Sequence, residues 1–392
     1  MLKQTIAVTA NGLRGLPSRI GTSSVIVIGI AGVVAVLVSV LAMARGFENT
    51  VGHTGRPDRV ILLRGNSNAE LSSTLTREQA QTILDKPGVR RDADGKPIGS
   101  AEAVAIVKLQ TIEDNSDSNV TMRGVGAQAP ALRPELKIVE GRMFQPAVRE
   151  LIVGRSAQRQ FRNLAVGDRI HFRDSDWTVV GAFETGGDTH ESELIGDAET
   201  VLSAYRRGAF NSVTLQLATA DGFAAFKDAV TTDPTLTVEV NRETDYYAKQ
   251  SERLTKILDF LAYFVGGIMA VGAMFGALNT MYSAVSSRSV EIATLRAIGF
   301  SGLPVVISVL VEALLLALLG GAIGAAIAWI AFNGNAINTL GGNFSQVVFR
   351  LSVAPALIGL GIAWACAIGM IGGLFPAVRA ARLPIVDALR AA

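Results

Sequence analysis

The sequence predicts a membrane protein with four transmembrane α-helices and a large extracytoplasmic α/β domain between the first and second helices. Its 392 residues are 49% hydrophobic and carry a net charge of only +2. The apolar residues gather in four long runs, one near the start of the chain and three near its end. Such runs are typical of membrane spans rather than of a larger soluble core. The stretch between the first two runs is long enough for one or two compact domains.

The composition also argues against several function classes. Charged residues make up 18% of the chain and no basic run alternates with aromatic residues, so no nucleic-acid-binding surface is expected. The single cysteine, Cys366, excludes an intrachain disulfide and a cysteine-based metal site. His53, His171 and His190 lack the spacing of metal ligands. Neither a G-x-x-x-x-G-K-S/T phosphate loop nor a G-x-S-x-G nucleophile motif occurs, which predicts that the chain is not itself an enzyme.

Residues 1–24 are expected to hold an amphipathic elbow helix on the inner leaflet. Leu2, Ile6, Leu13 and Leu16 fall near one helical face, and Pro17 ends the pattern. A disordered leader is the alternative interpretation.

The first apolar run, residues 25–44, carries no charge and is long enough to cross about 30 Å of hydrocarbon as a helix. A cleaved signal peptide is the alternative, since Lys3, Arg14 and Arg19 precede the run. The apolar core of a signal peptide is usually only about 7–15 residues long. We therefore expect a retained span.

Three further spans are expected at residues 257–282, 304–332 and 353–375. All are rich in glycine or other small residues, which let helix backbones approach closely. Gly272 and Gly276 form a G-x-x-x-G pair in the second span. That pair is a candidate dimer face, with packing inside one subunit or exposure to lipid as the alternatives.

The distribution of arginine and lysine predicts the orientation. Basic residues precede the first span, lie in the loop 283–303, and recur in the tail 376–392, whereas the loop 333–352 holds Arg350 alone. Because short cytoplasmic loops carry the excess of positive charge, both termini and the loop 283–303 are placed in the cytoplasm. The domain 45–256 and the short loop 333–352 then lie outside.

The outer domain is expected to contain two α/β lobes with a soft boundary. Strands are predicted at residues 59–63, 103–109, 120–125, 177–183 and 213–217, and helices at residues 76–84 and 222–230. Residues 239–261 read as a long helix that enters the second span. A helix continuous across the membrane surface would form a rigid stalk able to carry motion between the two sides.

The most informative segment is the cytoplasmic connection between the second and third spans, residues 279–300. Residues 290–296 fit a short amphipathic helix that Gly299 would end. Arg288, Glu291 and Leu295 share one face of it. A helix that docks a partner and an ordinary solvated connector are both compatible with the pattern.

Two polar features are weaker signals. Glu312 falls inside the third span, where an acid is costly. A structural contact with a polar neighbour such as Asn279 is favoured over a proton relay, because no second charge accompanies it. The acidic loop around Asp188 and His190, with Glu191 and Glu193, is interpreted as a solvated loop rather than a metal site.

Several segments together resemble one family. Residues 288–300, R-x-x-E-I-A-T-L-R-A-I-G-F, look like the coupling segment of the MacB/FtsX/LolC superfamily of ABC-transporter permeases. Residues 372–389 resemble the ending of that family and residues 11–19 its entry helix. Residues 148–183 and 191–197 resemble the MacB-type periplasmic core. MacB itself carries a fused ATPase domain before its first span, so this chain is closer to the split-subunit members, such as the DevC type.

The resemblance implies a specific assembly. Two permease copies would lie side by side in the bacterial inner membrane, each bound to a separate cytoplasmic ATPase that holds ATP and magnesium. The outer domain would combine a MacB-like porter part with a small β-rich lobe. The helix 288–297 would lie in a groove of the ATPase. Its expected contacts are Arg288, Glu291 and Arg296 through charge and Ile292 and Leu295 through packing.

Three functions compete at this stage. The first is the permease of an exporter that works with a periplasmic adaptor and an outer-membrane channel. The second keeps the architecture but transmits force without transport, to extract lipoproteins or to switch a cell-wall hydrolase. The third is a membrane-anchored sensor that needs no ATP.

Overall fold

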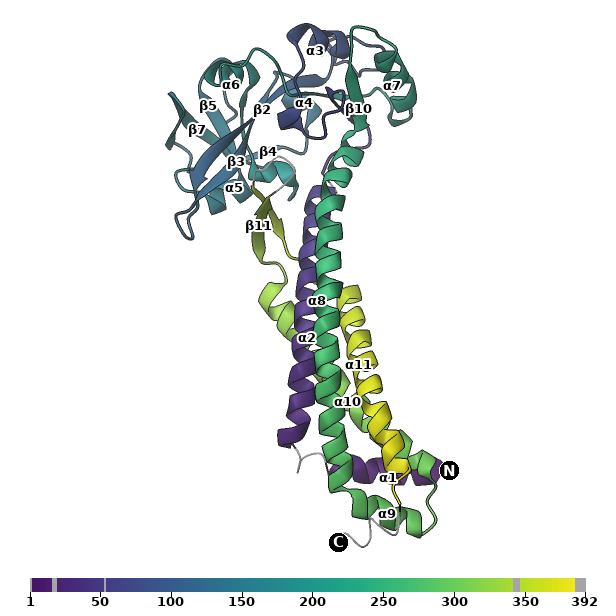
Figure 1. Ribbon diagram of the computed structural model, residues 1–392. Helices are drawn as coiled ribbons and strands as arrows, with labels where there is room; N and C mark the ends of the chain where they lie inside the picture. Colours follow the sequence, from purple (N-terminus) through teal and green to yellow (C-terminus); the bar gives the residue numbers. More distant parts are fainter. Residues whose placement is uncertain (1, 16–19, 53, 341–345, 385–392) are drawn as a thin grey trace. The chain divides into compact units, whose positions relative to one another are not determined.

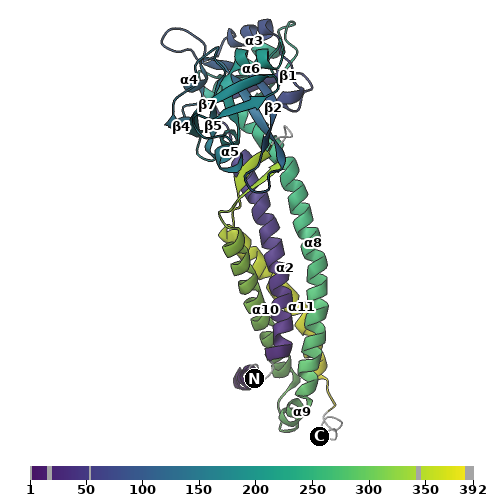
Figure 2. The same cartoon turned by 90° about the vertical axis from the view of Figure 1, so that its left-hand side faces the viewer.

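The computed structural model describes residues 2–15, 20–52, 54–340 and 346–384 and divides into two compact units. The first, which we call the membrane unit, comprises Met1–Arg45, Lys256–Asn335 and Leu351–Ala392. The second, the outer unit, comprises Gly46–Thr255 and Ala336–Arg350. Each unit is described by itself below (Figures 1 and 2).

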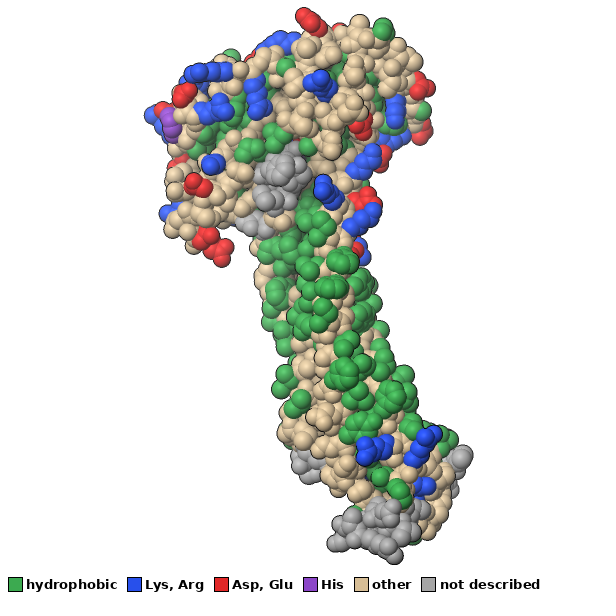
Figure 3. Space-filling view, viewed as in Figure 1, with side chains coloured by type: hydrophobic (Ala, Val, Ile, Leu, Met, Phe, Trp, Pro, Cys, Tyr) green, Lys and Arg blue, Asp and Glu red, His purple; other side chains and the backbone are tan. Residues whose placement is uncertain are grey.

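The helices of the membrane unit confirm the four predicted spans. They are α1 (Leu2–Arg14), α2 (Ile20–Phe47), α8 (Glu243–Ser287), α9 (Ser289–Ala297), α10 (Gly302–Phe332) and α11 (Pro355–Ala381), of which α2, α8, α10 and α11 are long and apolar enough to cross a membrane. Helix α11 continues beyond the expected end of the fourth span at Phe375. Ala377 and Ala380 are fully buried in the helix bundle, so packing stabilises the extra turns. Figure 3 shows hydrophobic side chains gathered over this unit.

Small residues set the distance between the helices. A Cβ added at Gly324 of α10 would lie 2.4 Å from the Ala31 carbonyl oxygen of α2, and one added at Gly369 of α11 would lie 2.4 Å from the Ala317 Cβ of α10. Helix α8 is the least buried of the four spans. The bundle core therefore lies mainly among α2, α10 and α11.

The outer unit is built on one ten-stranded sheet in the order β10-β1-β9-β2-β3-β8-β5-β7-β4, with β6 also paired to β7. The strands are β1 (Arg59–Arg64), β2 (Gly99–Gln110), β3 (Asp117–Val125), β4 (Lys137–Gly141), β5 (Glu150–Gly154), β6 (Arg169–Phe172), β7 (Ser175–Glu184), β8 (Leu194–Asp197), β9 (Ser212–Gln216) and β10 (Val238–Arg242). Its helices are α3 (Arg77–Leu84), α4 (Ala129–Leu132), α5 (Arg155–Gln160), α6 (Ala198–Ala204), α7 (Phe223–Thr231) and the 3-10 turn η4 (Thr189–Ser192).

Strand β2 joins the two halves of this sheet. Its residues 99–102 pair with β9, and its residues 103–110 pair with β3. One apolar core runs under both halves. The two lobes that the sequence suggested are therefore parts of a single sheet.

Most predicted elements of the outer unit have counterparts in the structure. Helix α3 begins as expected after Thr76, whose side chain forms a capping box with Gln79. The start of the long helix was placed too early: α8 begins at Glu243, because the five residues before it pair with β1 as strand β10. Strand pairing here overrides the weak helical preference of the segment.

The loop between the third and fourth spans contains a hairpin that the sequence analysis did not predict. Strands β11 (Ala336–Leu340) and β12 (Gln346–Arg350) pair antiparallel and belong to the outer unit. The Val348 amide donates to the Ser192 hydroxyl of η4 at 3.0 Å. The Gln346 side chain donates to the Ser118 hydroxyl of β3 at 2.8 Å. The hairpin is thus hydrogen-bonded to the outer sheet.

Candidate functional site

Helix α9 occupies the predicted position between the second and third spans. Arg288 stands at its N-cap, and Ile298 stands at its C-cap, directly before Gly299. Gly299 has φ +100°, a conformation that favours glycine, so it stops the helix as expected.

The burial of α9 shows which of its faces is available. Ile292 is 5% exposed and, with Ala293, lies against the bundle of its own chain. The opposite face presents Val290, Thr294 and Ile298, and Ile298 is 69% exposed. The expectation that Ile292 packs into a partner is therefore wrong, because the bundle already covers it. Leu295 is half-buried.

The charged side chains of α9 are bound within the membrane unit. Arg288 donates to Glu291 at 3.2 Å, and the Asn11 amide of α1 also donates to Glu291. Arg296 donates to the Leu383 carbonyl at 2.8 Å. Docking of a partner at Glu291 and Arg296 stays a prediction, whereas Arg288 turns inward.

Two further predicted sites lie in the spans: the glycine pair of the second span and the polar contact of Glu312 in the third. A Cβ added at Gly272 or at Gly276 would meet nothing within 4 Å, so among the described residues neither glycine packs inside the subunit. A dimer face and lipid exposure remain the two interpretations. Glu312 makes a structural polar contact, as expected, but its partner is Arg288 at 3.4 Å, and Asn279 is exposed.

The outer unit contains a buried charge network that sequence reasoning missed. The guanidinium of Arg123, on β3, binds three carboxylates at 2.7–2.8 Å: Glu70, Glu102 and Glu193. All four side chains are buried. Arg133 adds a second cation to Glu102 at 2.5 Å. A charged residue in the middle of an otherwise buried strand was the one local signal of this network.

The network reaches the first turn of α8. Arg59 of β1 donates to Glu243 of α8 at 2.5 Å and also pairs with Glu135. The Tyr246 hydroxyl accepts a hydrogen bond from the Glu70 amide at 3.2 Å. Buried ionic contacts therefore anchor the start of α8 in the outer sheet.

His190, in the turn η4, adds an imidazole to the network. Its Nδ1 lies 3.0 Å from Glu193, and its Nε2 lies 3.5 Å from the Tyr247 hydroxyl. Burial alone would lower the pKa of His190, but the charge and hydrogen bond of Glu193 outweigh burial and raise the pKa above 6.5. Burial alone would raise the pKa of Glu193, but the positive charge of Arg123, followed by that of His190, holds this pKa well below 4.5.

These shifts predict a pH window for the stability of the outer unit. The His190 contribution is complete below pH 6.5 and is lost as the pH rises through the raised pKa, whereas the Glu193 contribution is present above pH 4.5 and is lost on acidification. Burial raises the pKa of Asp188, so its ionisation also disfavours the folded state as the pH rises. We expect the free energy of unfolding to fall as the pH rises above 6.5, where His190 loses its proton.

The measurement is urea unfolding of the full chain, followed by the fluorescence of buried Trp177 with Trp329 and Trp364 replaced by phenylalanine. His190→Gln is expected to flatten the alkaline decline. The control is His171→Gln, since His171 pairs with Asp176 on the exposed surface. An unchanged alkaline decline in His190→Gln would contradict the assignment.

The acidic loop around η4 is not the solvated loop that the sequence suggested, because His190, Glu191 and Glu193 are buried. Glu191 accepts hydrogen bonds from the Thr185 and Gly187 amides at 2.8 Å, and Thr185 donates to Asp188. The described residues contain no group of three or more side chains arranged to hold a metal ion.

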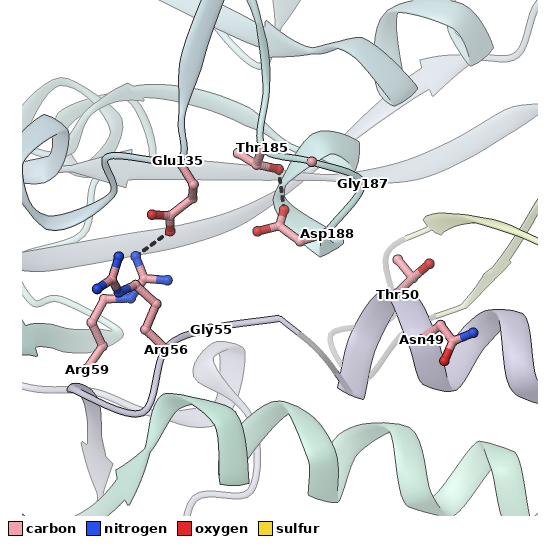
Figure 4. A pocket seen from close by; sticks show the side chains of 10 residues that line it. Asn49, Thr50, Gly55, Arg56, Arg59, Glu135, Thr185, Gly187 and Asp188 are labelled. Carbon is pink, nitrogen blue, oxygen red and sulfur yellow. Dashed lines mark hydrogen bonds and ion pairs between the residues drawn. The ribbon is translucent and has the colours of Figure 1, made fainter. Parts of the chain in front are cut away.

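A cavity of about 280 Å³ lies beside this loop (Figure 4). It is lined by Asn49, Thr50, Gly55, Arg56, Arg59, Glu135, Thr185, Gly186, Gly187 and Asp188. Arg59 pairs with Glu135, and Arg56 pairs with Asp58 at 3.0 Å. Because its cations are already neutralised by the protein's own carboxylates, the cavity is assigned no ligand.

Comparison with known proteins decides the family. The family model of the MacB-like periplasmic core domain matches residues 20–233, and that of the FtsX-like permease C-terminal region matches residues 263–385. The chain belongs to the MacB/FtsX superfamily of ABC-transporter permeases. As a member of this superfamily it is a multi-pass membrane protein whose outer unit is the periplasmic domain. The FtsX-like region contains the later part of α8 and all of α9 and α10, and neither matched region is an ATPase domain.

Individual relatives agree with the family. The chain is 24% identical to the macrolide export ATP-binding/permease protein MacB of a Shewanella species, over 98% of this chain and 59% of the relative. It is 23% identical to the uncharacterized ABC transporter permease YknZ of Bacillus subtilis, over 98% of this chain and 96% of the relative. The solved extracellular domain of YknZ covers 47% of this chain at 17% identity, with a TM-score of 0.37. The chain thus spans about three fifths of the MacB sequence and nearly all of YknZ.

Proposed function

We propose that this chain couples ATP hydrolysis by a separate cytoplasmic ATPase to movement of the periplasmic domain. The observation that supports the proposal is α9, a short helix between two spans, inside the FtsX-like region, with one face seated on its own bundle and one face exposed. An exposed apolar residue such as Ile298 is suited to a groove on a partner protein.

The proposed assembly has two permease copies and two ATPase subunits, which hold ATP and magnesium, in the bacterial inner membrane. Export of a substrate with a periplasmic adaptor and an outer-membrane channel is the favoured activity, since relatives named as macrolide export proteins match 98% of this chain. Force transmission without export is the alternative outcome. Capture of an adaptor from native membranes supports export.

Changing the exposed face of α9 is expected to release the ATPase. Ile298→Glu places a charge where an apolar contact is proposed, and we expect at least a tenfold loss of the ATPase activity that copurifies with the tagged chain. The matched control is Ile112→Glu, which alters a residue that is 48% exposed on the outer unit. Full retention of the ATPase by Ile298→Glu would remove this face from the proposal.

A further inference from the structure

The corner between α8 and α9 contains an ion pair that lies largely inside the helix bundle. The guanidinium Nη1 of Arg288 is 3.4 Å from the Glu312 carboxylate of the third span, and Nε is 3.2 Å from Glu291. Only 10% of the Arg288 side chain and 7% of the Glu312 side chain are exposed. One guanidinium thus connects a carboxylate of the coupling helix to a carboxylate of a membrane span.

Helix α1 covers this ion pair. A Cβ added at Gly12 would lie 3.2 Å from Arg288 Nη1 and 3.2 Å from the buried Ser308 hydroxyl, so the α1 backbone comes close to both. The next residue back, Asn11, donates to Glu291. The elbow helix, the coupling helix and the third span therefore meet around Arg288.

The chemistry of this site is that of a positioning contact. A carboxylate at this depth in an apolar bundle is costly unless a cation accompanies it. The planar guanidinium presents donors in several directions and can serve Glu312 and Glu291 together, which a lysine ammonium does less well. Because only 10% of the Arg288 side chain is exposed, little of its surface is accessible to another protein.

We infer that Arg288 and Glu312 form a pin that fixes the coupling helix to the third span, and that Arg288 is a positioning residue rather than an ATPase contact. The inference rests on the proposed function and deepens it. Force applied to the exposed face of α9 passes through Arg288 to α10, and through Glu291 and Asn11 to α1. Without this ion pair, α9 moves relative to α10, and force on α9 is not transmitted to the third span.

The test is a double-mutant cycle of Arg288→Gln and Glu312→Gln in the full chain, in lipid nanodiscs. Hydrogen exchange of the α9 amides in the permease alone is expected to quicken about tenfold in each single variant. The double variant should resemble Arg288→Gln, because once the guanidinium is gone the Glu312 carboxylate has no contact with it left to lose. Arg288→Lys, which keeps the charge, should restore part of the protection.

The second readout is the ATPase that copurifies with each variant. We expect both variants to retain it with an unchanged KM for ATP, since the nucleotide is held by the partner, and with a kcat at least severalfold lower. Exchange in α11 checks the fold. If exchange in α11 also quickens in a glutamine variant, the bundle itself is perturbed. The milder variants Arg288→Lys and Glu312→Asp then replace it in the same two measurements.

The outcomes separate the two proposals. Release of the ATPase by Arg288→Gln but not by Glu312→Gln would make Arg288 an ATPase contact and overturn the pin. Unchanged α9 exchange in Glu312→Gln would overturn it as well. A wild-type chain that retains no ATPase would overturn the proposed function and the coupling role of the pin, whereas the exchange cycle would still report the ion pair.

Discussion

Replacing Arg123 by methionine is expected to destabilise the outer unit by about 3–5 kcal/mol, the usual cost of removing one partner from a buried ionic contact. Methionine keeps most of the side-chain length, so the loss reports charge more than cavity formation. Glu102 keeps Arg133 and Glu193 keeps His190, but among the described residues Glu70 is left with the Ser212 hydroxyl, at 2.7 Å, as its remaining side-chain donor. Glu70 should therefore dominate the loss.

Urea unfolding with Trp177 as the sole tryptophan measures this effect at pH 7. The control is Arg206→Met, since Arg206 and Asp174 pair on the surface with side chains more than 80% exposed, and such a pair is worth about 0–1 kcal/mol. The Arg123→Met loss should shrink at pH 4, because carboxylates whose pKa Arg123 had lowered then take up protons. If Arg123→Met and Arg206→Met lost the same free energy of unfolding at pH 7, the proposed contribution of the buried network would be contradicted.

The sequence predicted this fold well where the signal is local. The four spans follow from long apolar runs, and helix α3 follows from the Thr76 capping box. The network around Arg123 was missed because its partners lie 21, 53 and 70 residues away in the chain. Nothing in the pattern of β3 says which distant acids will meet the guanidinium.

The coupling segment shows the same division between local and tertiary information. Periodicity predicted the helix, and Gly299 predicted its end. Periodicity did not reveal which apolar face would seat on the bundle, since Ile292 and Ile298 are chemically equivalent. The ion pair of Arg288 was also out of reach, because Glu312 lies 24 residues further along the chain.

Gly324→Ala is expected to destabilise the membrane unit by about 1–3 kcal/mol through overpacking. The added Cβ would lie 2.4 Å from the Ala31 carbonyl oxygen and 2.9 Å from the Val34 Cβ, so α2 and α10 must move apart. A backbone atom cannot rotate away as a flexible side chain can. The measurement is the temperature at which half of the detergent-solubilised chain loses its monodisperse size-exclusion peak.

Gly276→Ala is the matched control and should give the opposite sign. Alanine is a better helix former than glycine by about 1 kcal/mol, and at Gly276 the new methyl group meets nothing within 4 Å. Any loss there must come from outside the subunit, so a variant with an intact monomer but weaker self-association would identify this face of α8 as a dimer contact. A drop at Gly276 equal to that at Gly324, without any change in self-association, would contradict the packing of the bundle.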